Sequence, residues 1–287
     1  MNYRHAFHAG NFADVLKHAV LARILVHLAE KAAAFRVIDT HAGAGLYDLS
    51  SEAATRTGEW RDGIGRLAGA TLPDEIRALL APYLAAVTAA NQSGTLHRYP
   101  GSPLIALSLM RPQDRLVACE LEPGAAAALA ANLRRDARAR AVAIDGWIAL
   151  NAYVPPKERR GVVLIDPPYE DKQEFARLAE ALTGARRKWA TGVFLLWYPI
   201  KDRGGPDRLA AALHRSATAK VAPKILRAEL EWSPGGPPGP LTGAGLIVVN
   251  PPWRLADELA QLLPALRSVL APARGGRAEV DWLAGES

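Results

Sequence analysis

One stretch of this 287-residue chain limits the possible folds more than any other: the run Gly161–Ile165, followed by Asp166-Pro-Pro-Tyr169. The four residues before Asp166 are all apolar, as a parallel strand that is covered on both faces requires. The two prolines end the strand, because proline has no N–H for the ladder and its φ is fixed. Asp166 therefore stands at the carboxyl end of a buried strand, where open α/β sheets bind their ligands.

The Asp-Pro-Pro-Tyr motif resembles the catalytic motif of methyltransferases that act on exocyclic amino groups, chiefly adenine N6. Such an amine is a poor nucleophile, because its lone pair is delocalised into the ring. The Asp166 carboxylate and the Pro167 carbonyl could each accept one N–H and so free the lone pair. Tyr169 offers a ring on which a flipped-out base can stack. The alternative interpretation is a turn that merely ends a strand.

A second copy of the pattern, Asn250-Pro-Pro-Trp253, follows the apolar run 245–249. Asn replaces Asp in related amino-methyltransferases, so this motif competes with the first. However, Asn250 ends what should be the seventh strand, which usually runs antiparallel in this fold. That direction would carry Asn250 to the wrong edge of the sheet, so we favour Asp166 as the catalytic residue.

A glycine-rich turn follows an earlier strand and an acid in Phe35-Arg-Val-Ile-Asp-Thr-His-Ala-Gly-Ala-Gly45. It is not the dinucleotide fingerprint, because Asp48 stands where the third glycine should be. It resembles the first motif of class I S-adenosylmethionine-dependent methyltransferases, with His41 in place of the first glycine. Small residues such as Gly43 would let the backbone approach the methionine part of the cofactor, and His41 would point at the cofactor.

Two further acids end predicted strands. The strand 115–120 ends at Glu120, whose carboxylate can accept both ribose hydroxyls of an adenosyl group. The strand 141–144 ends at Asp145, which suits the amino group of the cofactor's adenine, and Trp147 or Ile148 would stack on that ring. Together with the glycine-rich turn, these acids predict one cofactor site at one edge of a sheet.

Two helix starts contribute further candidates. Ser102-Pro103 predicts an N-cap hydroxyl with proline at N1, and Ser102 would face the cofactor's carboxylate. Another helix begins near Asp14. His18 lies three residues before Leu21 and so on its inward face. A histidine there is usually a satisfied core residue; a contact with cofactor or substrate is the alternative.

The stretch 49–98 is too long for a minimal strand–helix–strand unit, in which an acid follows the glycine turn after about 20 residues. It reads as helical, with an amphipathic segment from Pro73 to Val87. We therefore expect a single domain over residues 1–287, with 49–98 as a helical insertion. Before it, residues 1–12 form an aromatic arm, in which Tyr3 and Arg4 could touch nucleic acid.

The composition of the chain favours some classes of protein function over others. The net charge of +6 and pI of about 9.6 favour an anionic partner. Three basic clusters together suggest a surface that tracks phosphates, namely Arg134 to Arg140, Lys157 to Arg160 and Arg186 to Lys188. One cysteine, no signal peptide and no membrane-length apolar run predict a cytoplasmic protein. His5 and His8 lack the acid or cysteine partners of a metal site, so none is expected.

Several blocks together are similar to the bacterial 23S ribosomal RNA adenine-N6 methyltransferase J family over the whole chain: Tyr3 to Asn11, Asp39 to Gly45, Tyr99 to Pro103, Asp166 to Tyr169 and Leu196 to Pro199. The resemblance implies a Rossmann-like class I α/β fold with a seven-stranded, mostly parallel sheet, to which 278–283 could add a short strand. It also implies S-adenosyl-L-methionine as cofactor, 23S rRNA as substrate and no need for more than a monomer.

The resemblance also assigns residues. The family's cofactor positions fall on His18, His41, Ser102, Glu120, Asp145, Gly146 and Asp166. Asp166 also carries the catalytic role and Tyr3 the substrate contact. Two alternatives stay open: a DNA adenine-N6 or cytosine-N4 methyltransferase, although no large target-recognition domain is evident, and a non-catalytic RNA-binding protein that keeps the fold.

Overall fold

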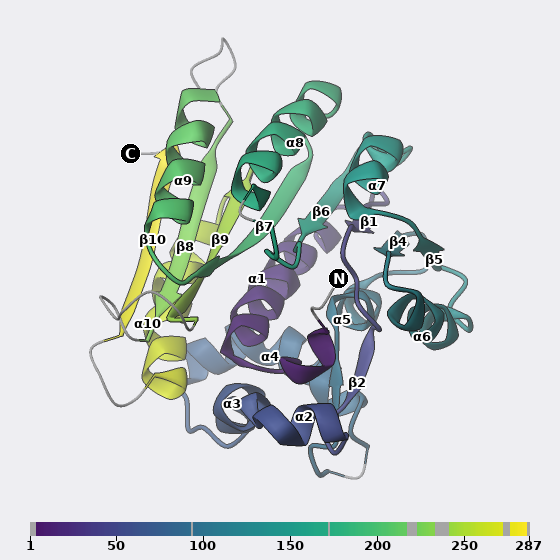
Figure 1. Ribbon diagram of the computed structural model, residues 1–287, viewed down its shortest axis with the longest axis vertical. Coiled ribbons are helices and arrows are strands. Elements are labelled where there is room, and N and C mark those ends of the chain that lie inside the picture. The colour runs from purple at the N-terminus through teal and green to yellow at the C-terminus, as the bar shows by residue number, and fades with distance from the viewer. Residues whose placement is uncertain are drawn as a thin grey trace.

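The computed structural model describes residues 4–92, 94–171, 173–216, 223–232, 241–271 and 276–285. Tyr3 and the Pro/Gly-rich segment 233–240 lie outside these ranges. The described chain is built in three layers, with a large sheet between two layers of helices (Figure 1). Among the described helices, none is long and apolar enough to cross a membrane.

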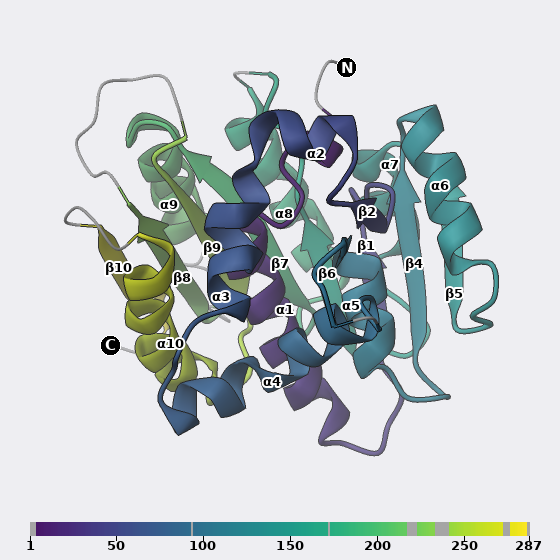
Figure 2. The same cartoon turned by 90° about the horizontal axis from the view of Figure 1, so that it is seen from below.

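The central sheet has eight strands, in the spatial order β10-β8-β9-β7-β6-β1-β4-β5, which can be followed across Figure 2. In chain order these are β1 (Arg36–Asp39), β4 (Arg115–Glu120), β5 (Ala139–Ala143), β6 (Gly161–Ile165), β7 (Val193–Ile200), β8 (Ile225–Glu231), β9 (Gly243–Val249) and β10 (Arg277–Ala284). The predicted count of seven is one short, because the C-terminal segment pairs along the edge of β8.

The sheet is parallel on one side and antiparallel on the other, where β7, β9, β8 and β10 alternate in direction. The strands from β5 through β4, β1 and β6 to β7 are parallel. β9 lies between β7 and β8 and is antiparallel to both, as expected for the seventh strand in chain order. The carboxyl ends of β1, β4 and β6 therefore meet at one edge of the sheet, whereas β9 ends at the opposite edge.

The strands are apolar on both faces because helices cover both. In β6, Val162 and Leu164 belong to one core cluster, and Val163 and Ile165 to the other. The first cluster includes α1 (Phe12–Ala29), α5 (Ser102–Leu109), α6 (Pro123–Leu133) and α10 (Leu255–Leu270); the second includes α7 (Gly146–Tyr153), α8 (Glu174–Lys188) and α9 (Gly204–Ser216). This double coverage explains why the strand had to be continuously apolar.

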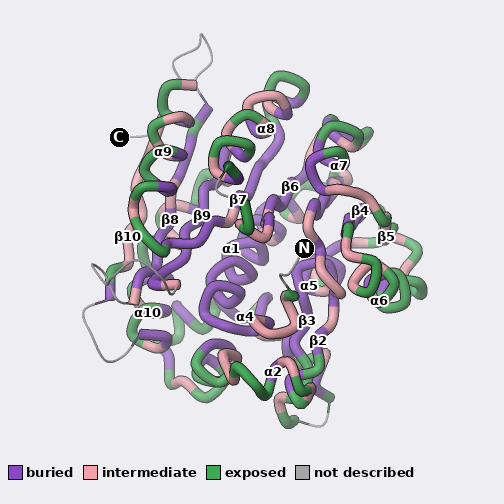
Figure 3. The backbone as a smooth tube through the Cα atoms, in the orientation of Figure 1, coloured by how far each residue is buried: buried purple, intermediate pink, exposed green. Residues whose placement is uncertain are grey.

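Helix α1 is buried along nearly its whole length, unlike the other helices (Figure 3). Its N-cap is Asn11, whose side chain accepts a hydrogen bond from the Asp14 N–H at 3.0 Å. The Asp14 carboxylate in turn accepts from the Gly10 N–H at 2.9 Å. These reciprocal bonds satisfy N–H groups that would otherwise be orphaned at the helix start. Asp14 therefore lies in the first turn, as predicted.

The segment 49–98 contains α2 (Glu52–Thr57), η2 (Arg61–Gly65), α3 (Arg66–Ala68) and α4 (Asp74–Ala89). The strands β2 (Leu46–Asp48) and β3 (Arg98–Pro100) flank the two ends of this segment and pair in a small antiparallel sheet. Gly63 packs against the start of α1, where a Cβ would lie 2.1 Å from the Gly10 carbonyl oxygen. The segment is thus helical, while its status as an insertion in a single domain stays a prediction.

Candidate active site

A cleft of about 570 Å³ opens at the edge where β1, β4 and β6 end. Nearly all described candidate residues line it: Arg4, His18, His41, Gly43, Ser102, Glu120, Asp145, Gly146 and Asp166. They come from the N-terminal segment, α1, the glycine turn, the start of α5, the end of β4 and the turns that follow β5 and β6. The topology therefore brings together residues that are up to 162 positions apart (Arg4 to Asp166; 166 − 4).

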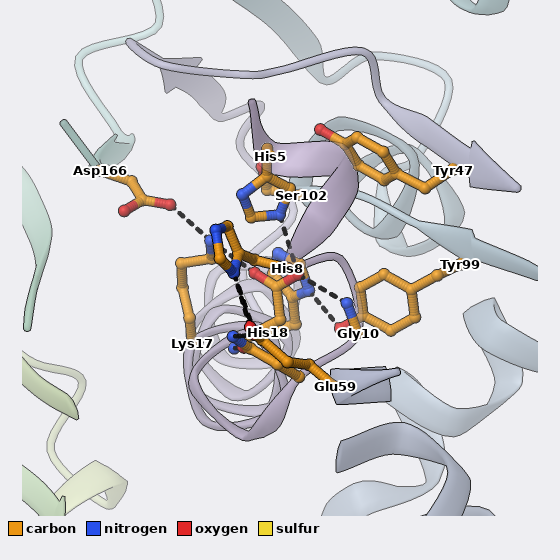
Figure 4. Close-up of polar contacts among 12 residues, drawn as sticks. His5, His8, Gly10, Lys17, His18, Tyr47, Glu59, Tyr99, Ser102 and Asp166 are labelled. Carbon is orange, nitrogen blue, oxygen red and sulfur yellow. Dashed lines mark hydrogen bonds and ion pairs between the residues drawn. The ribbon is translucent and has the colours of Figure 1, made fainter. Parts of the chain in front are cut away.

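Asp166 is held by a residue that sequence reasoning missed, Lys17 of α1. The Lys17 Nζ lies 2.5 Å from Asp166 Oδ2 and 2.9 Å from Asp14 Oδ1 (Figure 4). His5 Nε2 closes the chain of contacts, 2.9 Å from the other Asp14 oxygen. Lys17 has only 6% of its side chain exposed. One oxygen of Asp166, Oδ1, remains for a ligand.

The buried charges of this network stabilise one another. Burial alone would lower the pKa of Lys17, but Asp14 and Asp166 beside it hold that pKa well above its ordinary value. Burial would likewise raise the pKa of Asp14, yet His5, Lys17 and His18 hold it well below its usual range. Lys17 therefore stays cationic and Asp14 anionic at neutral pH.

A sequence signal for Lys17 existed. Asp14, Lys17 and His18 stand at i, i+3 and i+4, so they share one face of a helix. That helix is otherwise rich in apolar residues, and a lysine on its inward face needs a partner. The partner, Asp166, comes 149 residues later, and only the fold brings the two together.

His18 combines both interpretations offered for it. Its Nδ1 lies 2.7 Å from the Tyr99 hydroxyl, which is 3.0 Å from the Tyr83 hydroxyl, as in a satisfied core histidine. However, Nε2 is buried and has no hydrogen-bond partner among the described residues, and the residue lines the cleft. Burial lowers the pKa of His18 to about 3, so the ring is neutral.

His41 and Gly146 depend on each other. His41 Nδ1 lies 2.8 Å from the Thr40 hydroxyl, and its ring meets the edge of Trp147 with centroids 5.5 Å apart. A Cβ on Gly146 would lie 2.4 Å from the Thr40 carbonyl oxygen and 2.5 Å from His41 Cε1. Glycine is therefore needed to keep this wall of the cleft. Burial lowers the pKa of His41 to about 4.

The glycine turn and Glu120 are bound to each other. Gly43 has a left-handed φ of 61°, and its N–H donates to Glu120 Oε2 at 2.9 Å. Glu120 Oε1 accepts from the N–H groups of Leu121 and Glu122, each at 2.8 Å. A carboxylate has about four acceptor positions, so one, on Oε2, is left. Accepting two ribose hydroxyls would require one of these backbone bonds to open.

Ser102 corrects an expectation about α5. The N-cap is Gly101, so Ser102 is the first helical residue and Pro103 the second. The Ser102 hydroxyl does not cap the helix but donates to Asp39 Oδ2 at 2.6 Å. Asp39 is buried, and its burial raises its pKa to about 7 in spite of this hydrogen bond. Asp39 was expected as the acid that ends the strand before the glycine turn, whereas its contact with Ser102 was not predicted.

Asp145 is the N-cap of α7, since its Oδ1 accepts from the N–H groups of Trp147 and Ile148 at 2.8 and 3.1 Å. Of the two residues proposed to stack on an adenine, Trp147 lines the cleft, whereas Ile148 is 59% exposed and is not among the lining residues. The Arg177 guanidinium lies 4.8 Å from the Trp147 ring and also lines the cleft.

The rest of the Asp-Pro-Pro-Tyr motif points partly away from the cleft. Pro168 lines it, and Pro167 is buried. Tyr169 has a left-handed φ of 51°, and its hydroxyl donates to the Trp197 carbonyl oxygen at 2.8 Å. Its ring packs against Phe175, with centroids 4.9 Å apart. Tyr169 is not a lining residue, so its role in stacking stays a prediction.

The three basic clusters lie at the edge of the sheet opposite the one that carries Asp166. Residues 157–160 immediately precede β6, 186–188 end α8, and 134–140 span the end of α6 and the start of β5. All three therefore lie where the parallel strands begin. That these clusters form a surface that tracks phosphates stays a prediction, and such a surface would lie at the edge of the sheet opposite Asp166.

The rival motif also lies at this opposite edge. β9 ends at Val249, which pairs with Phe194 near the start of β7. The Asn250 side chain donates to the carbonyl oxygens of Ala190 and Gly192, both at 2.8 Å. It thus anchors a turn far from the cleft. Within the described ranges, no group of three or more His, Cys, Asp or Glu residues could hold a metal ion.

Comparison with known proteins adds an independent finding. Residues 32–284 match the model of a protein family described as ribosomal RNA large subunit methyltransferase D, RlmJ. The chain is 43% identical to ribosomal RNA large subunit methyltransferase J of Escherichia coli K12 and 40% identical to that of Haemophilus influenzae, with all of each chain covered. A crystal structure from Legionella pneumophila is 33% identical, with a TM-score of 0.86 over 96% of this chain and 98% of that one.

Proposed function

Because this chain belongs to the RlmJ family of ribosomal RNA large subunit methyltransferases, we propose that it methylates N6 of one adenine in 23S rRNA. The DNA methyltransferase alternative is not favoured, since both relatives are named for ribosomal RNA. The single observation that carries the reaction class is Asp166, which ends a parallel strand beside a glycine-lined cleft and is oriented by a buried lysine.

The cleft suits S-adenosyl-L-methionine, the cofactor that the methyltransferase family implies. Its volume of about 570 Å³ is in the range of sites for ligands of this size. Gly43 and Gly146 have no room for a Cβ, which would lie 2.0 Å from the Tyr47 hydroxyl oxygen and 2.4 Å from the Thr40 carbonyl oxygen, respectively, so glycine lets the backbone pack closely at the wall of the cleft. The orphaned Nε2 of His18 offers a polar contact. The donors and acceptors present therefore fit the group.

We assign the binding of the cofactor to eight residues: His18, His41, Gly43, Ser102, Glu120, Asp145, Gly146 and Asp166. When bound, it supplies an electrophilic methyl group on a sulfonium sulfur. Glu120 would use its remaining acceptor position for a ribose hydroxyl, and the second oxygen of Asp145 would accept from the adenine amine. Trp147 would provide the apolar wall beside that ring.

The chain's own part in the chemistry is to prepare the amine. Lys17 occupies Asp166 Oδ2, so Oδ1 would accept one N–H of the target adenine and the Pro167 carbonyl the other. Both acceptors are preorganised, the carboxylate by its ion pair and the carbonyl by proline. With the cofactor bound, the nitrogen held by these two acceptors would take up its methyl group, and the N–H proton that the amine loses would leave through Asp166 Oδ1 to solvent. Arg4 and Tyr169, together with Tyr3, would hold the flipped nucleotide.

We further propose that residues 1–287 act as one domain, with 49–98 inserted, as a monomer and in the cytoplasm, where ribosomal RNA is its substrate. The test is transfer of labelled methyl groups to protein-free 23S rRNA that lacks its native modification, followed by nucleoside mass analysis. N6-methyladenosine in the digest is the expected product. Incorporation only into a matched DNA hairpin would overturn the substrate, and no incorporation into any nucleic acid would overturn the reaction.

A further inference from the structure

The Asn250-Pro-Pro-Trp253 turn lies beside a second hollow, of about 280 Å³, at the edge of the sheet opposite Asp166. β6 crosses the sheet between the two sites. Arg160 and Asp166 flank this strand and are six residue steps apart, which at about 3.3 Å per step puts them about 20 Å from each other. A base bound at Asp166 therefore cannot reach this hollow, and anything bound here is a separate event from methyl transfer.

Trp253 is the main apolar feature of this edge. Its side chain is 75% exposed, more than any other large hydrophobic side chain in the described ranges, and it lines the hollow. The Arg254 guanidinium lies 5.3 Å from its ring centroid and also forms an ion pair with Glu30. Asn250 fixes the turn through its two bonds to backbone carbonyls. The Trp253 indole is thus held in place on the surface and is not part of the hydrophobic core.

Two cations and one carboxylate, Glu30, are among the residues that line the hollow. The cations are Lys31 and Arg160, and within the described ranges the Arg160 guanidinium donates to the carbonyl oxygens of Leu28 and Ala33 and to no carboxylate. Three further exposed cations lie nearby: Lys157 and Arg159 in the loop before β6, and Arg187 at the end of α8. The two elements touch, since Trp189 Nε1 donates to the Arg159 carbonyl oxygen.

The carboxylates of this edge are already neutralised. Glu30 pairs with Arg254, and Glu158 pairs with Arg36 at 2.8 Å. By contrast, no carboxylate in the described ranges forms an ion pair with Lys31, Arg159 or Arg187. The edge therefore presents several uncompensated positive charges around one exposed aromatic ring. Surfaces that bind single-stranded nucleic acid combine these two features: cations follow the backbone and an aromatic ring stacks on a base.

We propose that this edge is a second, non-catalytic site for unpaired RNA. A base stacks on Trp253, and Lys31, Arg159 and Arg187 contact the adjoining phosphates. The choice of RNA as the polyanion rests on the proposed function. The segment bound here is not the one that carries the target adenine, because the sheet separates the two sites. The site would let the enzyme hold a longer stretch of rRNA than its target hairpin.

The test measures binding of the full chain to a labelled uridine oligonucleotide of about twelve nucleotides, by fluorescence anisotropy at several salt concentrations. This probe contains no adenine. We expect Trp253→Ala to weaken binding roughly tenfold and Trp253→Phe to retain most of the affinity, because phenylalanine still stacks. Arg187→Glu should weaken binding and lower the salt dependence by about 0.7 per lost phosphate contact.

Arg267→Glu is the matched control. Arg267 is equally exposed but lies near the other end of α10, so affinity should change less than about twofold. Unchanged affinity in Trp253→Ala would overturn the proposal. Methylation of 23S rRNA by the unaltered chain is measured in parallel. Its absence would overturn the proposed function without affecting the oligonucleotide result, so the two failures are distinguishable.

Discussion

Two turns of this molecule have nearly the same sequence and opposite surroundings. Asp166-Pro-Pro-Tyr169 and Asn250-Pro-Pro-Trp253 each follow a fully buried apolar strand. β6 is parallel to its neighbours and β9 is antiparallel to its own. One turn therefore lies at the carboxyl edge of the parallel strands and the other where those strands begin.

The surroundings decide what each polar side chain does. Asp166 meets a buried lysine and shares a cleft with residues of the glycine turn. The Asn250 side-chain amide donates to two backbone carbonyl oxygens, and Trp253 is exposed to solvent. The difference shows that a short motif specifies a local conformation, whereas strand direction and the neighbouring elements assign its chemistry. Four predictions would break or sharpen this comparison.

The largest contrast should be in catalysis. Asp166→Ala should slow methyl transfer to rRNA by roughly 10²–10³-fold or more, because the target amine loses a preorganised acceptor. Asn250→Ala should leave the rate within about twofold, because its turn is distant from the cleft. Single-turnover transfer of labelled methyl measures both, and thermal melting checks that each variant is folded. Equal losses in the two variants would contradict the assignment of the catalytic edge.

The second contrast concerns stability: removing a cation at the catalytic edge should cost more unfolding free energy than removing one at the far edge. Lys17→Met leaves Asp14 and Asp166 buried without their cation and should cost about 3–5 kcal/mol of unfolding free energy. Arg254→Met removes a pair whose side chains are 44% and 45% exposed, so we expect a cost below about 1 kcal/mol. Urea unfolding measures both. A loss of similar size at the two positions would show that Lys17 is not an essential partner.

The catalytic edge should also respond to pH through Asp39. Its pKa in the folded chain, about 7, is above the ordinary 3.8. The protonated form therefore contributes stability that is fully present below about pH 4 and lost as pH rises through 7. Asp39→Asn cannot ionise, so its stability relative to the unaltered chain should increase over this range, by up to about 4 kcal/mol. Urea titrations at pH 4, 5.5 and 7.5 test this, and a constant difference would refute it.

The smallest effect should come from the turn at the far edge. Asn250 has a φ of 53° and two amide hydrogen bonds. Asn250→Ala should cost about 1–3 kcal/mol, because it loses those bonds and strains the backbone. Asn250→Gly accepts the positive φ, so it isolates the loss of the bonds. If the two variants melt alike, strain contributes nothing at this turn.

Much of the fold could be predicted because its signals are local. Continuous apolar runs identified the buried strands, and the acid or proline after each run marked where β4 and β6 end. The antiparallel seventh strand followed from chain order. The eighth strand was only suspected, because β10 lies at the edge of the sheet and its residues are half-buried, which weakens the pattern.

The candidate site was predicted less completely, for a physical reason. Residues that follow strands at one edge, such as Glu120 and Asp145, could be grouped from strand order. Lys17 could not, and neither could the contact between Asp39 and Ser102, because both depend on distant partners: Lys17 meets Asp166 across 149 residues, and Asp39 meets Ser102 across 63. The role expected for Ser102 as an N-cap was one residue off, since Gly101 takes that position.

The sequence by itself determined the fold class, the strand-ending acids and the family, because each depends on residue types at short spacing. Only the tertiary structure decided which of two Pro-Pro turns faces the cleft, which lysine holds Asp166, and that the basic clusters lie at the far edge. These depend on strand direction and on contacts between distant segments. Short-range patterns cannot encode such contacts, because the chain forms them only when its layers pack.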